Sequence, residues 1–141
     1  MRRIILMALL AVFSSSAMAE WVKVGYSKSD GGMTIYVNPS SMRRSGDTKK
    51  IWVQTDYQTL QEVEGKQFWS AKIYSEINCD KTSERALNYS WHSEHMGGGK
   101  TVYANSTPAD WDAISPDSIA EPVFDYACLR SNPLIEILKN N

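Results

Sequence analysis

Cys79 and Cys128 are the two cysteines of this 141-residue chain, and they lie far apart in sequence. No C-x-x-C motif brings them together, so a redox-active pair is not expected. In an exported protein, two cysteines of one small domain are expected to form a disulfide, because the compartment is oxidising. We therefore predict a structural crosslink. In the chain-entropy model it adds roughly 4 kcal/mol to the free energy of unfolding.

The other residues that could do chemistry form no recognisable constellation. His92 and His95 are the only histidines; at this spacing they point to opposite faces of a strand, whereas a helix or loop could bring them together. Zinc needs three or four ligands, and no further ligand lies nearby, so we expect no metal site. The three glycines at 97–99 before Lys100 lack the strand-then-helix context of a phosphate loop and are interpreted as a bend. Without a Ser-His-Asp or Cys-His motif, we predict no enzyme and no cofactor.

Residues 68–79 alternate strictly and therefore position Cys79. One side collects mostly apolar side chains, namely Trp69, Ala71, Ile73, Ser75, Ile77 and Cys79. The other side collects mostly polar ones, namely Ser70, Lys72, Tyr74, Glu76 and Asn78. Such alternation is typical of a half-buried β-strand, because successive side chains point to opposite faces of a sheet. The segment predicts a strand whose apolar face ends at Cys79.

Five shorter segments also have strand character, and turn-forming residues separate them. They are residues 21–27, 33–38, 51–57, 85–93 and 101–105. In residues 85–93, Leu87, Tyr89 and Trp91 are expected to share one face. Pro39 is expected to end the second segment, because proline cannot donate to the ladder. Residues 40–50 are interpreted as a solvated basic turn, with a basic patch for an acidic partner as the alternative. Residues 58–67 are a second polar connection. The spacing predicts one antiparallel meander of about six strands.

The period changes near the C-terminus, where a helix is predicted. Ser118 and Glu121 have the spacing of a capping box. One helical stripe then collects Ala120, Val123, Phe124, Ala127 and Cys128. Because this stripe and the strand's apolar face each carry a cysteine, we predict an α+β fold with the C-terminal helix tied to the sheet. Beyond this helix, residues 134–138 form a short apolar tail.

Residues 1–19 have the pattern of a signal peptide. Arg2 and Arg3 precede an apolar run at residues 4–13, which is too short to span a bilayer, and Ala17-Met18-Ala19 offers a cleavage site. The expected mature domain is residues 20–141, without a lipobox cysteine. We therefore expect a periplasmic or secreted protein without stable membrane insertion. The net charge of −1, or about −3 without the two arginines, argues against nucleic-acid binding.

The tryptophans divide into a predicted core and a predicted surface. Trp69 and Trp91 fall on apolar strand faces and are expected to be core residues. Trp52 and Tyr74 fall on the opposite faces of their strands, and Tyr74 shares its face with Lys72 and Glu76. Aromatic side chains beside charges are typical of protein-binding surfaces. Cross-strand pairing on a solvated face is the alternative.

An ordered set of short pieces resembles the surface-adhesin protein E family of exported bacterial proteins. The pieces are Trp21 to Tyr26-Ser27, Ile35-Tyr36-Val37, Lys50-Ile51-Trp52, Asp56-Tyr57, Ser75-Glu76-Ile77-Asn78-Cys79-Asp80, Arg85, Met96-Gly97 with Gly99, Val102-Tyr103, Trp111, Ser115-Pro116-Asp117-Ser118 with Glu121, and Ala127-Cys128. The resemblance implies a six-stranded antiparallel sheet with a C-terminal helix tied to its concave face by the Cys79–Cys128 disulfide. It also implies binding to host matrix proteins and a dimer. This chain departs from the lipoproteins of the family because it lacks the lipobox cysteine.

Two functions of different classes follow from these observations. The first is an exported, non-enzymatic binding module whose partner is a host matrix glycoprotein or an envelope protein, with a homodimer as a further expectation. The alternative is a periplasmic inhibitor of a secreted hydrolase such as lysozyme, which would insert residues 93–100 or residues 27–32 into the enzyme's cleft. An apolar pocket with a perturbed carboxylate pair would instead favour an enzyme.

Overall fold

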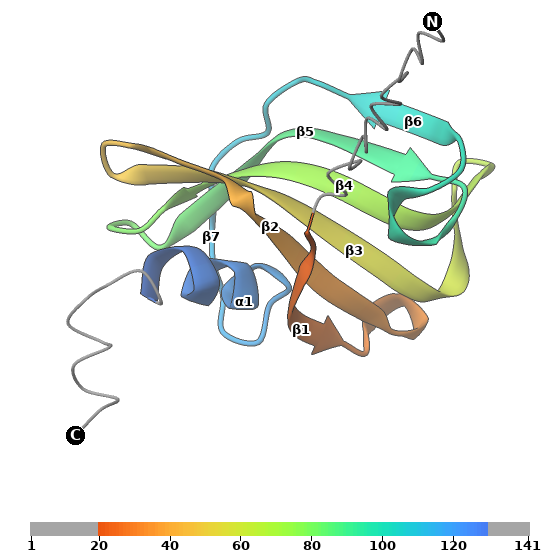
Figure 1. The fold of residues 1–141 in the computed structure, drawn as a ribbon, viewed down its shortest axis with the longest axis horizontal. Helices are drawn as coiled ribbons and strands as arrows, with labels where there is room; N and C mark the ends of the chain where they lie inside the picture. Colours follow the sequence, from red (N-terminus) through yellow and green to blue (C-terminus); the bar gives the residue numbers. More distant parts are fainter. Residues whose placement is uncertain (1–19, 130–141) are drawn as a thin grey trace, which may run out of the picture.

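The alternating segments form one antiparallel sheet in the computed structural model, which describes residues 20–129 (Figure 1). The strands follow one another across the sheet in sequence order, so the predicted meander is confirmed. They are β1 Val22–Ser27, β2 Met33–Ser45, β3 Thr48–Val63, β4 Lys66–Asn78, β5 Ser83–His92 and β6 Thr101–Asn105. A short strand that was not predicted, β7 Asp112–Ala113, pairs with β5. The predicted signal peptide and the predicted apolar tail lie outside the described residues.

Several strands are longer than the sequence pattern predicted. Residues 40–50 and 58–67 were predicted to be connections, and this prediction is wrong for most of both stretches. β2 and β3 continue to a turn at Gly46 and Asp47, and β3 and β4 continue to a turn at Glu64 and Gly65. These strand ends are mostly polar, and Met42, Leu60 and Val63 are isolated apolar residues in them, so they carry no regular alternation that would distinguish them from a loop.

Pro39 was predicted to end the second strand, but β2 runs through it. The register between β2 and β3 is offset between Asn38 and Arg43, so Pro39 lies in an irregular stretch of the ladder. The backbone N–H of Trp52 donates to the Ser41 hydroxyl at 3.0 Å in this stretch. The strand tolerates a proline there because a bulge does not require its missing N–H.

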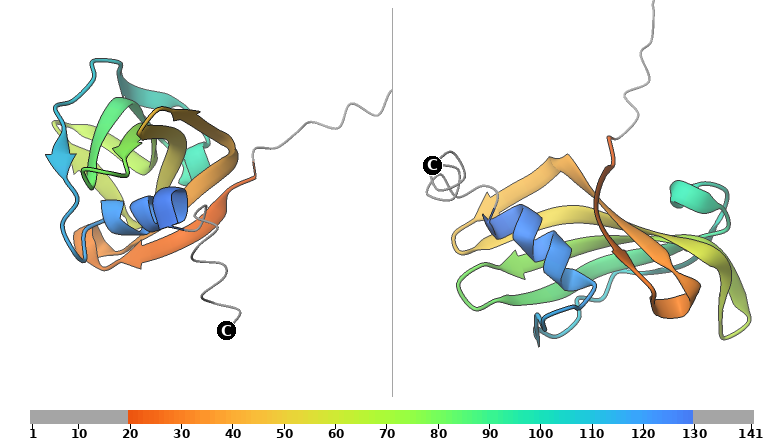
Figure 2. Two further views of the ribbon diagram at one scale, coloured as in Figure 1. Left: turned by 90° about the vertical axis from the view of Figure 1, so that its left-hand side faces the viewer. Right: turned by 90° about the horizontal axis from the view of Figure 1, so that it is seen from below.

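The sheet curls, and the C-terminal helix lies against its concave face (Figure 2). This helix is α1, Ala120–Phe124, and the π-helical turn η3, Asp125–Leu129, continues it. Both contribute to a core of buried aliphatic side chains, namely Ile35, Val37, Ile51, Val53, Ile77, Val123 and Ala127. Each larger side chain stabilises the fold by about 1.5–3 kcal/mol relative to the exposed state. The predicted α+β fold is therefore confirmed.

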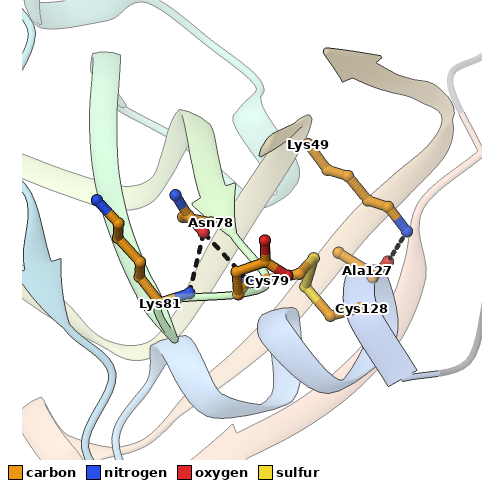
Figure 3. The surroundings of a disulfide bond; sticks show 7 residues. Lys49, Asn78, Cys79, Lys81, Ala127 and Cys128 are labelled. Carbon is orange, nitrogen blue, oxygen red and sulfur yellow. Dashed lines mark hydrogen bonds between the residues drawn. A yellow bond between two sulfur atoms is a disulfide. The ribbon is translucent and has the colours of Figure 1, made fainter. Parts of the chain in front are cut away.

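The Cys79–Cys128 disulfide joins the end of β4 to η3 (Figure 3). The Cα atoms of the two cysteines lie 5.6 Å apart, and 49 positions separate them in sequence. Beside the crosslink, the ammonium group of Lys49 donates to the backbone carbonyl of Ala127 at 2.5 Å. A cation at the C-terminal end of a helix stabilises its unpaired carbonyls. A covalent bond and a charged hydrogen bond therefore hold this end of the helix to the sheet.

The predicted capping box at Ser118 and Glu121 does not form. The helix begins at Ala120, so its N-cap is Ile119, which has no oxygen on its side chain. A carboxylate oxygen of Glu121 accepts a hydrogen bond from the backbone N–H of Asp117 instead. Ser118 is one residue too early in the chain to cap this helix.

Trp69 and Leu87 do not occupy the strand faces that the predicted alternation assigned to them. Trp69 was predicted to be a core residue, but Phe68 is the buried one, with 4% of its surface exposed. The cause is an irregularity in pairing, since the β3–β4 register jumps between Asp56 and Gln61, opposite this part of β4. In β5, a register shift leaves Leu87 without a partner strand residue. Bulges of this kind change which side chains share a face.

Candidate functional site

Trp52 and Tyr74 form a stacked pair on the outward face of the sheet, which is the face opposite α1. They are direct cross-strand partners on β3 and β4. Their ring centroids lie 4.9 Å apart with an interplanar angle of 22°. Both side chains are half-buried. The sequence-predicted pair is thus brought together by the register, as aromatic cross-strand pairs commonly are.

The two charged residues predicted beside this pair have internal contacts. Glu76 is 7% exposed, and its carboxylate accepts a hydrogen bond from the Arg85 guanidinium at 2.7 Å. The Thr48 hydroxyl donates to the second carboxylate oxygen of Glu76 at 3.3 Å. Lys72 lies directly against Gly97 of the loop that follows β5. The geometry places all four predicted side chains on the outward face, but Glu76 already has a charged partner within the chain.

Arg85 and Trp111 extend this surface, and sequence reasoning did not identify them as site residues. The guanidinium carbon of Arg85 lies 4.8 Å from the ring centroid of Trp111, as in a cation–π contact. Trp111 is 42% exposed. The register pairs Arg85 with Glu76, so a correct alignment of β4 and β5 could have placed it, whereas Trp111 lies outside the strands and gives no periodic signal. We call Trp52, Tyr74, Glu76, Arg85 and Trp111 the outward patch.

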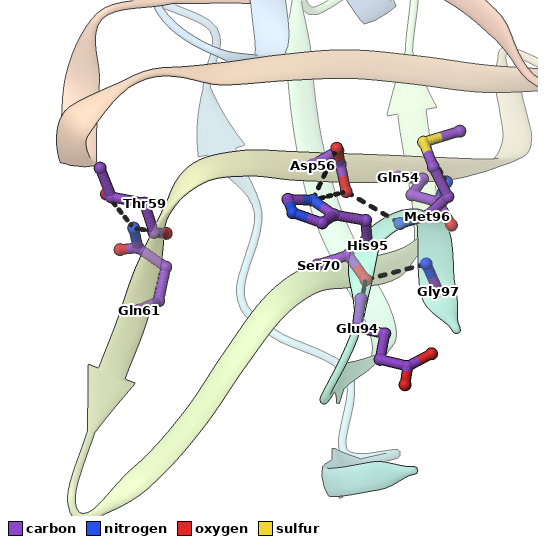
Figure 4. A network of polar contacts seen from close by, with 9 residues as sticks. All are labelled: Gln54, Asp56, Thr59, Gln61, Ser70, Glu94, His95, Met96 and Gly97. Carbon is purple, nitrogen blue, oxygen red and sulfur yellow. Dashed lines mark hydrogen bonds and ion pairs between the residues drawn. The ribbon is translucent and has the colours of Figure 1, made fainter. Parts of the chain in front are cut away.

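Residues 93–100 fold back over the other end of the outward face (Figure 4). The Ser70 hydroxyl donates to the Glu94 carbonyl at 2.6 Å and accepts from the Gly97 N–H at 2.8 Å. Asp56 accepts from the Met96 N–H at 2.8 Å, and its carboxylate oxygens lie 3.1 Å from Nδ1 of His95. These bonds fix the loop, including its helical turn η2 His95–Gly97, against β3 and β4.

Residues 27–32 are also bonded to the sheet. The N–H of Gln58 donates to the Gly32 carbonyl at 2.9 Å. The side chains of Thr59 and Gln61 donate to the Asp30 carbonyl at 3.2 and 2.9 Å. Neither of the two loops considered for insertion into an enzyme cleft therefore projects freely from the domain.

The histidines have separate roles. His92 is 7% exposed and its Nε2 atom lies 2.8 Å from the Ser90 hydroxyl. Burial lowers the pKa of His92, and the neighbouring Lys72 ammonium lowers it further. The His95 ring lies 4.7 Å from the Trp69 ring, between centroids. Among residues 20–129, no group of three or more histidine, cysteine or acidic side chains is placed to hold a metal ion.

A cavity of about 380 Å³ lies between the concave face and α1. Its walls are mainly apolar and aromatic, and they are formed by Val53, Thr55, Tyr57, Ala71, Ile73, Ser75, Glu84, Ala86, Tyr89, Trp91, Ile119, Ala120 and Val123. Burial raises the pKa of the Glu84 carboxyl, and the neighbouring Asp112 carboxylate raises it further. Asp112 is not part of the wall, so the cavity does not contain the pair of carboxylates that acid–base catalysis would use.

A comparison with protein families matched residues 21–129 to surface-adhesin protein E. This match covers most of the chain and includes every described strand and the helix.

The chain belongs to the surface-adhesin protein E family.

Solved structures of Haemophilus influenzae protein E have the same fold. One crystal form is 13% identical in sequence, with a TM-score of 0.57 over 68% of this chain and 80% of that chain. A structure of protein E from non-typeable Haemophilus influenzae is 12% identical, with a TM-score of 0.57 over 82% of this chain and 79% of that chain. A search of curated proteins found no match. At this level of identity the structural likeness shows the fold alone.

Membership in this family identifies a surface-adhesin-like module and suggests export. The disulfide agrees with an oxidising compartment. Within residues 20–129, none of the helices has the length and apolar character that a membrane span requires.

Proposed function

We propose that this protein is an exported, non-enzymatic binding module that holds a protein partner on the outward patch. The observation that carries the proposal is the stacked Trp52–Tyr74 pair on the face that α1 leaves uncovered. The Arg85–Trp111 pair extends the same face. Tryptophan, tyrosine and arginine are the residue types that contribute most to binding at protein interfaces.

The geometry suits such a role because the patch is already ordered before binding. Trp52 is fixed by its stack on Tyr74, and Arg85 is fixed by Glu76 on one side and by Trp111 on the other. Side chains that are held in place lose less conformational entropy when a partner binds. We infer that the partner is a host matrix glycoprotein or a protein of the bacterial envelope, in keeping with the family's name.

Binding to matrix and envelope extracts tests this proposal. The exported protein and its Trp111→Ala and Arg85→Ser variants should be immobilised separately. The proteins that each one captures from the extracts are then identified and their amounts compared. Loss of a central contact residue weakens binding by at least about 2 kcal/mol, which corresponds to roughly thirtyfold in Kd. Tyr26→Ala is the matched control, because Tyr26 is a 48% exposed aromatic residue on β1, outside the patch. Equal capture by all variants would refute the proposal.

Inhibition of a secreted hydrolase such as lysozyme is the alternative function predicted for this protein. The two loops that would enter an enzyme cleft are bonded to the sheet, and this observation does not favour the inhibitor. A lysis assay with lysozyme and cell-wall suspensions separates the two functions. A binding module of the proposed kind leaves the rate of lysis unchanged.

A further inference from the structure

The cavity beneath α1 lies between the first turn of the helix and the concave face of the sheet. The first helical turn contributes Ile119, Ala120 and Val123 to one wall, and the strands contribute the rest. Ile119 is 39% exposed, so the cavity reaches solvent beside it. Its volume of about 380 Å³ lies within the range of small-molecule sites.

Aromatic side chains make one end of the cavity rigid. Trp91 stacks on Phe68 with the ring centroids 4.6 Å apart, and its ring lies 4.7 Å from that of Tyr103. Tyr57 meets Phe68 edge to face at 5.7 Å. A wall of rings in mutual contact keeps its shape when the cavity is empty, because each ring is held by its neighbours.

The charges around the cavity are of one sign. Glu84 is the only formally charged side chain among the wall residues, and none of them is lysine, arginine or histidine. Arg85, the next residue in the chain, points to the outward face, where it binds Glu76. Asp112 lies opposite Glu84 in the β5–β7 register. Burial raises the pKa of Glu84, and the neighbouring Asp112 carboxylate raises it further.

We propose that this cavity binds a small organic cation with an apolar body. The cationic group lies against the Glu84 carboxylate, and the apolar body lies against the aliphatic and aromatic side chains of the wall. Opposite charges attract more strongly where burial keeps water away. The site is independent of the outward patch, because the two lie on opposite faces of the sheet.

A small ligand fits these observations better than a protein segment. The helix and the curled sheet lie on two sides of the site (Figure 2), and the exposed wall residue is Ile119, just before α1. A folded partner would have to displace α1, which the disulfide and the Val123 and Ala127 contacts hold in place.

Calorimetric titration with benzyltrimethylammonium tests the proposal, with phenylacetate as an anion of similar size. The exported protein should bind the cation and not the anion. Glu84→Gln, which keeps the size of the side chain, should raise the Kd for the cation at least tenfold. Asp47→Asn makes the same charge change in an exposed turn outside the cavity and should leave the Kd unchanged.

A second variant addresses the location of binding. Ala86→Leu places a larger side chain in the cavity wall and should abolish binding while the protein remains folded by circular dichroism. Chemical-shift changes on titration should centre on the Trp91 indole and the Val123 methyl groups. The proposal is overturned by absent binding at millimolar cation, by equal affinity for phenylacetate, by an unchanged Kd in Glu84→Gln, or by shift changes confined to the outward patch.

Discussion

Gly25 of β1 and Pro122 of α1 are in such close contact that a Cβ atom at position 25 would lie 2.8 Å from Cγ of Pro122. The first turn of the helix thus rests directly on the backbone of the edge strand. The other end of the helix is held by the Cys79–Cys128 disulfide. Both ends of the helix are therefore held to the sheet. The first turn packs closely on Gly25, which has no side chain, and the disulfide bonds the other end covalently.

Gly25→Ala is expected to destabilise the protein by about 1–3 kcal/mol, because the added methyl group forces the helix and β1 apart. Urea unfolding of the variant measures this change. Pro122→Ala in the same protein should restore part of the loss, since it removes Cγ, the nearest atom to the added methyl group, and keeps Cβ, which would lie at 3.0 Å. Equal losses in the single and double variants would show that the contact is not the cause.

Replacing both cysteines, as in Cys79→Ser with Cys128→Ser, is expected to lower the free energy of unfolding by about 2–5 kcal/mol. The reason is that the crosslink restricts the unfolded chain and ties η3 to β4. Thermal unfolding with and without reductant measures the effect. Reductant should lower the Tm of the native protein and leave the double variant unchanged. Titration of two reactive thiols in the unreduced native protein would contradict the prediction.

Ser70→Ala is expected to cost about 1–3 kcal/mol and to loosen residues 93–100. The Ser70 side chain is fully buried, and its removal leaves the Glu94 carbonyl and the Gly97 N–H without this partner. Hydrogen exchange should accelerate at Gly97 before it does in the sheet. Ser40→Ala is the control, because Ser40 is exposed, and its effect should stay within about 0.5 kcal/mol. Unchanged exchange at Gly97 in Ser70→Ala would rule out the proposed anchoring.

Glu84→Gln is expected to make the protein more stable at pH 7. The pKa of Glu84 is raised above 4.5 in the folded state, chiefly by burial. The folded state therefore binds more protons than the unfolded state above pH 4.5, and this carboxyl lowers the free energy of unfolding as the pH rises through that window. The advantage of Glu84→Gln should shrink as the pH is lowered towards 4.5. A constant difference between pH 4 and pH 7 would contradict this assignment.

The sequence period predicts which face of the sheet Trp52 and Tyr74 occupy, but it does not predict that the two rings are in contact. Trp52 and Tyr74 fall opposite the apolar residues of their strands, so alternation alone places both on the face away from the core. Whether they meet depends on register, which for two separate strands depends on turn geometry and on bulges. The sequence predicted the face of each ring, and the β3–β4 pairing placed the two rings in contact.

Three of the positions where prediction failed share one physical cause. Pro39, Trp69 and Leu87 lie at or opposite register shifts, where one strand carries extra residues and the period of two is interrupted. Side chains alternate between the two faces only where the strands pair regularly. The alternation of residue types in the sequence therefore cannot predict where a bulge occurs. The cavity wall shows the consequence, since Ala86 rather than Leu87 lies beside Tyr89 and Trp91.

The sequence by itself determined the meander, the C-terminal helix and the crosslink, because each depends on local alternation, helical period or the pairing of two cysteines. Only the tertiary structure decided which residues meet in the outward patch and which residues line the cavity. Arg85 and Trp111 meet although 26 positions separate them, and Glu84 lines a cavity between the start of α1 and the curled sheet. Contacts of this kind depend on the curvature of the sheet and on the length of the helix together, and no local pattern encodes their combination.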